Sequence, residues 1–192
     1  NGNRAQPPGT SDSPVVDAKS TWWNSWYYLK ADGSVVVDGR RTYGGANEWG
    51  EIHDSGVVDI VGAGGDFAFL KADGTVTLEG QFSRYNQADV DALSSGGVVA
   101  VHNAIRSFCA FMDDGSVRLL NVDANTTDVT LPAAQIPYDQ VDRVYSNLGA
   151  FAVLMKDGSV HTFGGHAYGG RSDGITTELL SGVRDIYPTD YG

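Results

Sequence analysis

One motif recurs four times along this chain, and the recurrence limits the possible folds more than any other feature. Each copy is an apolar run, an Asp-Gly pair and a second run in which apolar and polar residues alternate. The pairs lie 41, 41 and 43 residues apart and begin at Asp32, Asp73, Asp114 and Asp157. Apolar runs that flank an Asp-Gly pair are a strong signal for a β-hairpin, in which the Gly takes a positive φ. The sequence therefore predicts four hairpins of one repeating fold.

A short β-branched run precedes each hairpin, so each repeat is expected to contain three or four strands. A fifth copy of this run, with no hairpin after it, lies near the C-terminus. The five runs begin at Val15, Val57, Val98, Val141 and Val183. We expect an N-terminal arm over residues 1–14, a repeat domain over 15–192 and loops between the repeats. The repeats are expected over residues 15–56, 57–97, 98–140 and 141–182, with a partial fifth over 183–192.

The hairpin strands carry apolar residues at fixed phases, which predicts the core. In the second strand, alternation places apolar pairs on one face. These pairs are Val35 with Val37, Val76 with Leu78, and Val117 with Leu119. In the first strand, two phases are apolar in every repeat. They hold Trp26, Phe67, Phe108 and Phe151, and Leu29, Leu70, Phe111 and Leu154. Cys109 lies in register with Ala68 and Ala152, so it is expected to be a small buried residue.

Charge and composition argue against several function classes. The chain has 192 residues, with 13 Lys and Arg against 24 Asp and Glu and a formal net charge of -11. Nucleic acid is not expected as a partner, because binding to phosphates needs clustered cations. The 25 Gly and 6 Pro are typical of a turn-rich, all-β chain. No apolar run reaches the roughly 18 residues of a membrane helix, so no membrane span is predicted.

The repeat resembles a known family. The strings LKADGSVVV and KDGSVHTFGGHAYGG, each followed by SGVVDI or SGVRDI, are similar to the regulator-of-chromosome-condensation (RCC1) repeat. The likeness is to its divergent, Gly-rich secreted type. The resemblance implies a β-propeller that binds other macromolecules with loops at one end of its ring. One departure is that the Trp of the family's Trp-Gly pair is missing in every repeat, and its Tyr-Gly-Gly survives only at Tyr43 and Tyr168.

The fifth β-branched run raises a question of pairing, because a strand without neighbours exposes unpaired backbone groups. Three arrangements remain open. The strand closes a small ring, another copy of the chain completes it, or the sequence is a fragment of a longer propeller. The predicted assembly residues are Val183, Asp185, Ile186 and Tyr187.

An aromatic cluster over residues 21–28 is the main candidate binding site. Exposed Trp is typical of interface anchors and of platforms on which sugars stack. The predicted binding residues are Trp22, Trp23, Tyr27, Tyr43 and Tyr168. The alternative is that the Trp side chains cover the end of an incomplete ring or pack under the N-terminal arm.

No catalytic residue, metal site or cofactor is predicted. The four His residues lack the spacing of a zinc site, and the recurring Asp-Gly pairs are explained by turn geometry, although calcium at an acidic loop remains open. We expect a non-enzymatic, extracellular or cell-surface module that binds protein or assembles with copies of itself. The alternative is an inhibitor or lectin that captures an enzyme or a glycan through end-face loops.

Overall fold

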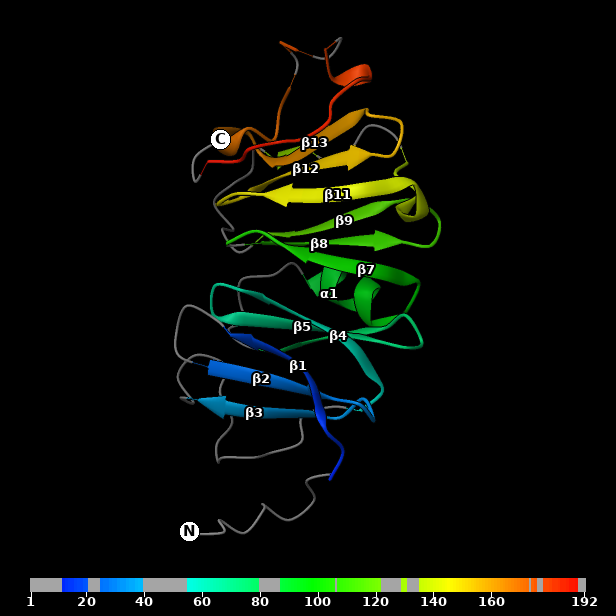
Figure 1. Ribbon diagram of the computed structural model, residues 1–192, viewed down its shortest axis with the longest axis vertical. Helices are drawn as coiled ribbons and strands as arrows, with labels where there is room; N and C mark the ends of the chain where they lie inside the picture. The colour runs from blue at the N-terminus through cyan, green and yellow to red at the C-terminus, as the bar shows by residue number, and fades with distance from the viewer. Residues whose placement is uncertain are drawn as a thin grey trace. The chain divides into compact units, whose positions relative to one another are not determined.

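The computed structural model describes residues 12–20, 25–39, 55–79, 87–105, 107–121, 129–130, 135–172, 174–175 and 178–189. The chain divides into two compact units, Asn1–Ser83 and Arg84–Gly192. Each unit contains two antiparallel sheets, and each sheet follows the chain order of its three main strands (Figure 1). The predicted all-β fold built from repeated sheets is confirmed.

The first unit contains the first and second sheets. The first sheet consists of β1 (Val15–Ser20), β2 (Ser25–Lys30) and β3 (Val35–Gly39). The second consists of β4 (Val57–Ala63), β5 (Asp66–Lys71) and β6 (Val76–Glu79). In each sheet the middle strand pairs with both neighbours.

The second unit contains the third and fourth sheets. The third sheet consists of β7 (Val98–Asn103), β8 (Ser107–Met112) and β9 (Val117–Asn121). The fourth consists of β11 (Val141–Ser146), β12 (Ala150–Met155), β13 (Val160–Gly165) and the short edge strand β10 (Val129–Thr130). Three 3-10 turns lie beside it: η3 (Tyr138–Gln140), η4 (His166–Tyr168) and η5 (Glu178–Leu180).

One linker is more ordered than a loop. Helix α1 (Gln87–Ser94) precedes the third sheet, and Leu93 is its buried residue. The Gln87 side-chain amide donates to Asp91 Oδ1 one turn later at 2.8 Å, which supports the helix. Because only one apolar residue of this helix is buried, its sequence shows little helical periodicity of hydrophobic residues. The helix is therefore not predicted from the sequence.

Each hairpin turns through three residues that end in the predicted Gly. In the first hairpin, the N–H of Gly33 donates to the carbonyl of Lys30, and the N–H of Lys30 donates to the carbonyl of Ser34, both at 2.9 Å. The four turn glycines have φ between 78° and 82°. The Asp side chain also accepts hydrogen bonds: Asp32 Oδ1 receives the N–H and hydroxyl of Ser34 at 3.0 and 2.7 Å. The motif is therefore Asp-Gly-Ser/Thr, because the third residue donates to the first.

Every hairpin is also bonded to the strand that precedes it. The residue before each Asp donates its N–H to the carbonyl just before the first strand of that sheet. The four bonds run from Ala31 to Pro14, Ala72 to Gly56, Asp113 to Gly97, and Lys156 to Gln140, at 2.8 to 2.9 Å. All four first strands also carry a register shift after their first residue, in β1, β4, β7 and β11. The repeat is thus a repeat of hydrogen bonds as well as of sequence.

Within each unit, the two sheets pack face to face, and each contributes a different face to the contact. In the first unit, Tyr27 of β2 packs on Phe67 and Phe69 of β5, with ring centroids 3.7 and 5.4 Å apart. In the second unit, the equivalent positions Cys109 and Phe111 of β8 share a core with β12. We call the face of a sheet at the Tyr27 and Leu29 positions its donor face, and the face at the Phe67 and Phe69 positions its acceptor face. Within each unit, the donor face of one sheet therefore packs on the acceptor face of the next sheet.

Burial confirms much of the predicted core. Val35, Val37 and Val76 are buried, and so are the four residues at the Leu29 phase. Leu78, Val117 and Leu119 are only half-buried. Cys109 is buried as predicted, and this burial raises the pKa of its thiol. The prediction for Trp26 is wrong: its equivalents Phe67, Phe108 and Phe151 are buried, but Trp26 is 46% exposed.

The turn glycines generate the first prediction. Gly158 has φ +82, and a Cβ there would lie 2.9 Å from the backbone nitrogen of Gly182. Gly158→Ala should lower the free energy of unfolding by on the order of 1 to 3 kcal/mol, because it forces a strained backbone and a clash. Gly174→Ala is the matched control, since a Cβ there meets nothing within 4 Å. Urea unfolding measures both; equal stability of the two variants would contradict the role of Gly158.

The carboxylates of the hairpin turns give the second testable prediction. Hydrogen bonds from the following Ser or Thr lower the pKa of Asp73, Asp114 and Asp157. A lowered pKa contributes stability above the unfolded value of about 3.9, and this stability is lost as the pH falls through the folded value. Replacing all three residues by Asn, which does not titrate, should make the urea midpoint fall less between neutral pH and about pH 3. An equal fall in the wild-type and triple-variant proteins would contradict the assignment.

Candidate functional site

The segment over residues 183–188 adopts the local geometry of a first strand. The N–H of Val183 donates to the carbonyl of Gly158 at 3.0 Å, just as Val57 donates to Gly33 at 3.0 Å in the first unit. The N–H of Ile186 donates to Asp185 Oδ1 at 3.0 Å, matching Ile60 and Asp59 of β4 at 2.8 Å. The backbone of this segment is thus arranged as at the start of a further sheet.

This segment nevertheless pairs with no strand in the part of the chain that the structure describes. The predicted fifth strand is corrected accordingly. Its sequence directs the local turn and the docking, but a strand also needs a neighbour that exchanges backbone hydrogen bonds.

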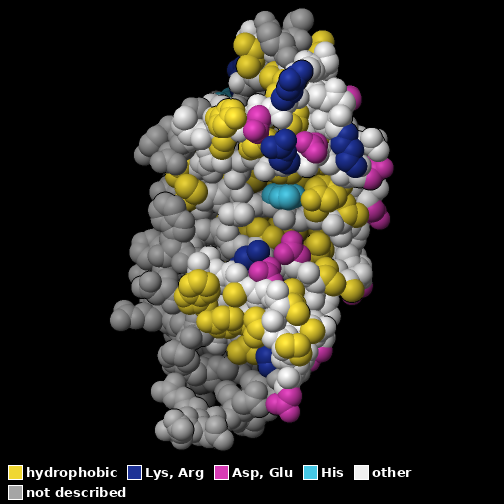
Figure 2. Space-filling view, viewed as in Figure 1, with side chains coloured by type: hydrophobic (Ala, Val, Ile, Leu, Met, Phe, Trp, Pro, Cys, Tyr) yellow, Lys and Arg dark blue, Asp and Glu magenta, His cyan; other side chains and the backbone are white. Residues whose placement is uncertain are grey.

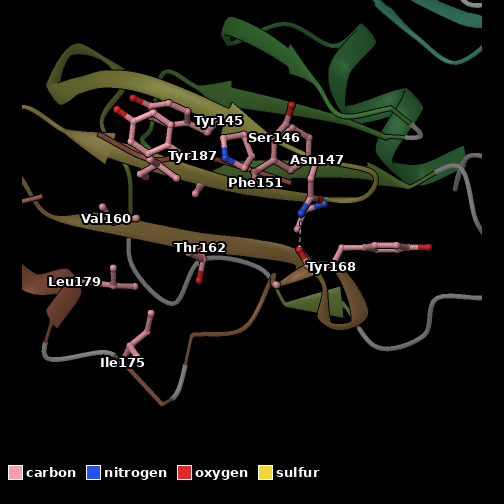
Figure 3. Close-up of a pocket in the computed structure, with 15 residues that line it drawn as sticks. Tyr145, Ser146, Asn147, Phe151, Val160, Thr162, Tyr168, Ile175, Leu179 and Tyr187 are labelled. Atoms are coloured by element: carbon pink, nitrogen blue, oxygen red, sulfur yellow. Dashed lines mark hydrogen bonds between the residues drawn. The ribbon is translucent and has the colours of Figure 1, made fainter. Parts of the chain in front are cut away.

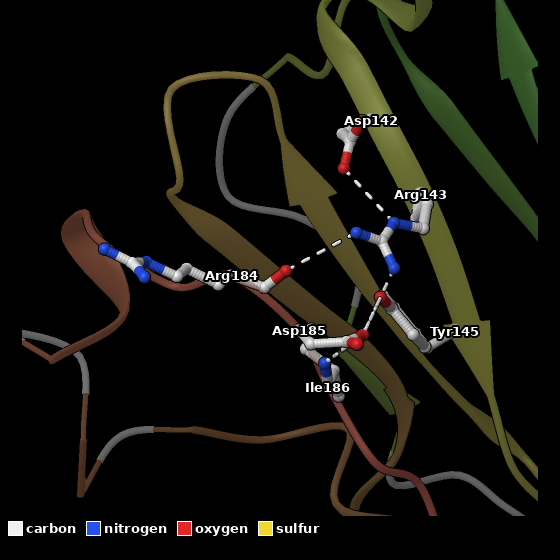
Figure 4. Close-up of polar contacts among 6 residues, drawn as sticks. All are labelled: Asp142, Arg143, Tyr145, Arg184, Asp185 and Ile186. Atoms are coloured by element: carbon white, nitrogen blue, oxygen red, sulfur yellow. Dashed lines mark hydrogen bonds and ion pairs between the residues drawn. The ribbon is translucent and has the colours of Figure 1, made fainter.

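Polar contacts anchor the segment to β11 (Figure 4). The hydroxyl of Tyr145 donates to Asp185 Oδ1, and Arg143 Nη1 lies 3.3 Å from the same oxygen. Arg143 Nη2 lies 3.5 Å from the carbonyl oxygen of Arg184. The hydrogen bond from Tyr145 and the N–H of Ile186 lower the pKa of Asp185. Asp185, predicted as an assembly residue, therefore fixes the segment onto its own sheet.

A pocket of about 310 Å³ opens between this segment, the fourth sheet and the turns after β13 (Figure 3). Its volume is within the range of small-ligand pockets in proteins. The lining includes Ile186, Tyr187 and Pro188 of the segment, and Ile175 and Leu179 on the opposite side. From the fourth sheet it includes Tyr145, Ala152, Val160 and Thr162.

Several polar groups of the lining are engaged within the protein. The side-chain amide of Asn147 donates to the carbonyl of Tyr168 at 2.7 Å, and its Oδ1 accepts the N–H of Ala150 at 2.9 Å. The hydroxyl of Thr162 lies 2.8 Å from that of Ser172. Since these groups and the hydroxyl of Tyr145 already have partners, the pocket suits an apolar occupant.

Tyr168, one of the predicted binding residues, lines this pocket. Its ring packs on two glycines: a Cβ at Gly149 or Gly165 would lie 2.8 or 2.9 Å from Tyr168 Cδ2. Tyr168 of the surviving Tyr-Gly-Gly motif thus packs its ring directly on the backbone at Gly149 and Gly165. Sequence reasoning missed Ala152 and Thr162, although aligning the repeats shows small residues there in place of Tyr27 and Val37.

A second exposed surface is the acceptor face of the first sheet. Trp26 stacks on Tyr28 with ring centroids 6.4 Å apart, and Val36 is half-buried beside Tyr28 in the register of β2 and β3. Tyr27, predicted to bind a partner, is instead fully buried, because it projects from the opposite, donor face. Trp22, Trp23 and Tyr43 lie outside the described residues, so their predicted roles stay predictions.

The histidines form no metal centre where the structure describes them: no three His, Cys, Asp or Glu residues gather there as a group. His102 Nε2 lies 3.0 Å from the hydroxyl of Tyr138, and burial lowers the pKa of this His. On the face drawn in Figure 2, basic and acidic side chains lie next to one another. None of the described helices has the length and hydropathy that a bilayer crossing requires.

No protein-family model and no curated protein matches this sequence. Solved structures do match its fold. The CRINKLY WD40 ectodomain of the Arabidopsis thaliana receptor kinase ACR4 has 13% identity and a TM-score of 0.56, covering 82% of this chain and 53% of that chain. Human WBSCR16 has 18% identity and a TM-score of 0.54, covering 89% and 52%. Yeast RCC1 (Prp20), solved with Kap60, has 15% identity and a TM-score of 0.50, covering 79% and 42%.

The fold is an RCC1-like β-propeller fold. The predicted resemblance is confirmed at this level, and the repeated three-stranded sheets correspond to propeller blades. The chain spans about half the length of these solved structures.

Proposed function

We propose that this chain is a non-enzymatic protein-binding module of the divergent, Gly-rich secreted type, and that it self-associates through the acceptor face of its first sheet. The observation that carries the proposal is the exposure of Trp26 on that face. At the equivalent positions the three other sheets bury Phe67, Phe108 and Phe151. Large exposed aromatic side chains are typical anchors of protein interfaces.

The chemistry of this face favours another copy of the repeat as its partner. In the first unit, an acceptor face of the same kind, with Phe67 and Phe69, is covered by Tyr27 and its neighbours from another repeat. Beside Trp26 and Tyr28, the register places Ala18, Ser20, Val36 and Asp38 on this face, so small and apolar residues outnumber the one acidic residue. A twofold dimer, the commonest closed assembly, would bring the same face of a second copy, with its own Trp26, onto this one.

The environment of the single thiol argues against catalysis by a cysteine nucleophile. Cys109 is fully buried, and burial raises the pKa of the thiol, whereas a nucleophilic cysteine needs an accessible thiolate.

Self-association is tested by light scattering over a range of concentrations. The wild-type mass should rise from monomer to dimer, and Trp26→Ser should weaken the association by at least about tenfold. Val58→Ser is the matched control, because Val58 is also apolar and 55% exposed but lies on β4. A wild-type protein that stays monomeric at every concentration, or an equal effect of both variants, would contradict the proposal.

An extracellular location is supported by the likeness to the ectodomains of two plant receptor kinases, from Arabidopsis thaliana and Physcomitrella patens. Antibody labelling of intact cells of the source organism tests it. Labelling without permeabilisation, or protein in the medium, is expected; labelling only after permeabilisation would place the protein inside the cell and overturn this part of the proposal.

A further inference from the structure

A histidine of the third sheet contacts the turn that leads into the fourth sheet. His102, near the end of β7, is half-buried, and its Nε2 lies 3.0 Å from the hydroxyl of Tyr138 in η3. Both rings also pack on Phe111 of β8, with ring centroids 5.7 and 5.1 Å away. Phe111 and Tyr138 belong to the core that the third and fourth sheets share, so the three rings connect the third sheet to η3.

The turn η3 is an addition to the repeat. In the first unit, Val57 is both the residue whose N–H donates to the preceding hairpin and the first residue of β4. In the second unit these two roles are separate. The N–H of Ile136 donates to the hairpin of the third sheet at 2.7 Å, but β11 begins only at Val141. The residues between them form η3 and carry Tyr138. A repeat of this fold can thus be built without the contact to Tyr138.

The histidine is likewise particular to this repeat. The equivalent positions of the other sheets, aligned by strand register, hold Lys19, Val61 and Tyr145. Because an apolar Val fills this position in the second sheet, the fold does not require an imidazole here. A histidine adds a group whose charge changes between about pH 5 and pH 8.

We propose that the contact between His102 and Tyr138 is an acid-sensitive latch, which holds η3 on the third sheet while the imidazole is neutral and releases the turn when the imidazole is protonated. Protonation of histidine at mildly acidic pH is a general way to change a packed contact. The latch controls how firmly the start of the fourth sheet is held. It does not depend on self-association through Trp26.

The surroundings of His102 favour the neutral ring. Burial lowers the pKa of this histidine, because a charged ring would lose contact with water. The titratable groups that face it are the hydroxyl of Tyr138 and the thiol of Cys109, its partner in the register of β7 and β8. Neither group is an anion near neutral pH, so neither compensates the charge of an imidazolium.

The charged groups of the neighbouring elements have partners of their own. In η3, Asp139 Oδ2 accepts the side-chain amide of the following residue at 2.9 Å, and Lys156 Nζ donates to the carbonyl of Asp139 at 2.6 Å. On β11, Asp142 and Arg143 form an ion pair at 3.2 Å. The side chains that β9 and β12 contribute to this core are apolar. None of these charged groups is a cause of the shift in the pKa of the histidine, which is due to burial.

The direction of the pH dependence follows from the lowered pKa. The released turn binds a proton more readily than the closed turn, because its histidine is in water. The latch therefore stabilises the closed turn fully above about pH 6.5, the ordinary value for histidine. This stabilisation is lost as the pH falls through the lowered pKa of His102.

The test is hydrogen exchange of the full chain, measured by NMR at about pH 7.5 and about pH 5.5 and corrected for the intrinsic exchange rate. The reporting amides are Ile136, Gln140 and Lys156, whose hydrogen bonds hold η3 and its ends. Their protection should fall at least about threefold at the lower pH. The amide of Asp113 is the internal control, because its bond to the carbonyl of Gly97 is the equivalent bond of the third sheet. An equal fall at Asp113 would indicate general unfolding and would overturn the proposal.

Variants of the protein assign the effect to the latch. His102→Val introduces the residue that the second sheet has at this position, Val61, and should abolish the pH dependence of the reporting amides. Tyr138→Phe removes only the hydroxyl and should lower their protection at about pH 7.5, because the hydrogen bond is lost. His161→Val is the matched control: His161 is also half-buried but lies on β13, so the pH dependence should remain. A pH dependence that persists in His102→Val, or that disappears equally in His161→Val, contradicts the latch.

Titration of the imidazole by NMR is an independent measurement that needs no folded variant. The pKa of His102 in the wild-type protein should lie below the ordinary value of about 6.5. A pKa at or above that value would overturn the proposal. In the exchange experiments, the buried Cys109 should remain unreactive toward a thiol reagent in every variant that keeps its fold.

Discussion

The stacking of a donor face on an acceptor face is the interaction on which the rest of this structure depends. A three-stranded sheet with apolar residues on both faces cannot bury them alone, so each repeat needs a neighbour on each side. Within the first unit, Tyr27 meets Phe67 and Phe69, and within the second, β8 shares a core with β12. Among the described residues, Trp26 on the acceptor face of the first sheet is 46% exposed, and Ala152 on the donor face of the fourth sheet lines the pocket.

Hydrogen bonds of the hairpin turns determine how the strands are positioned for this packing. The Asp-Gly-Ser/Thr turns close the hairpins through their own side chains. Each turn is bonded to the strand before it, and the turn at Gly158 also accepts the N–H of Val183. Tyr145 and Arg143 then hold Asp185 against β11. These polar contacts hold the segment over residues 183–188, which forms one border of the apolar pocket.

The sequence predicts the strands well because they rest on local signals. The Asp-Gly pairs and the alternating residues locate all four hairpins. It fails at Trp26 and Tyr27, since the repeat indicates the phase of a side chain but not whether a neighbouring sheet covers that face. It also treats Val183–Ile186 as a strand, a state that depends on a partner. The pocket forms where Ile175, Leu179 and Ala152 come together from separate segments of the chain. No single sequence motif predicts that proximity.

The bonds at the hairpin tips have a consequence for variation in chain length. The carbonyl of Gly33 receives the N–H of Val57, and the carbonyl of Gly56 receives the N–H of Ala72. The C-terminal end of the linker between these sheets is therefore fixed to the hairpins on either side of it. The entropic cost of closing a flexible loop grows only slowly with its length. Linkers of this repeat can accordingly gain or lose residues while the spacing of the sheets stays the same, which makes them natural positions for inserted sequence.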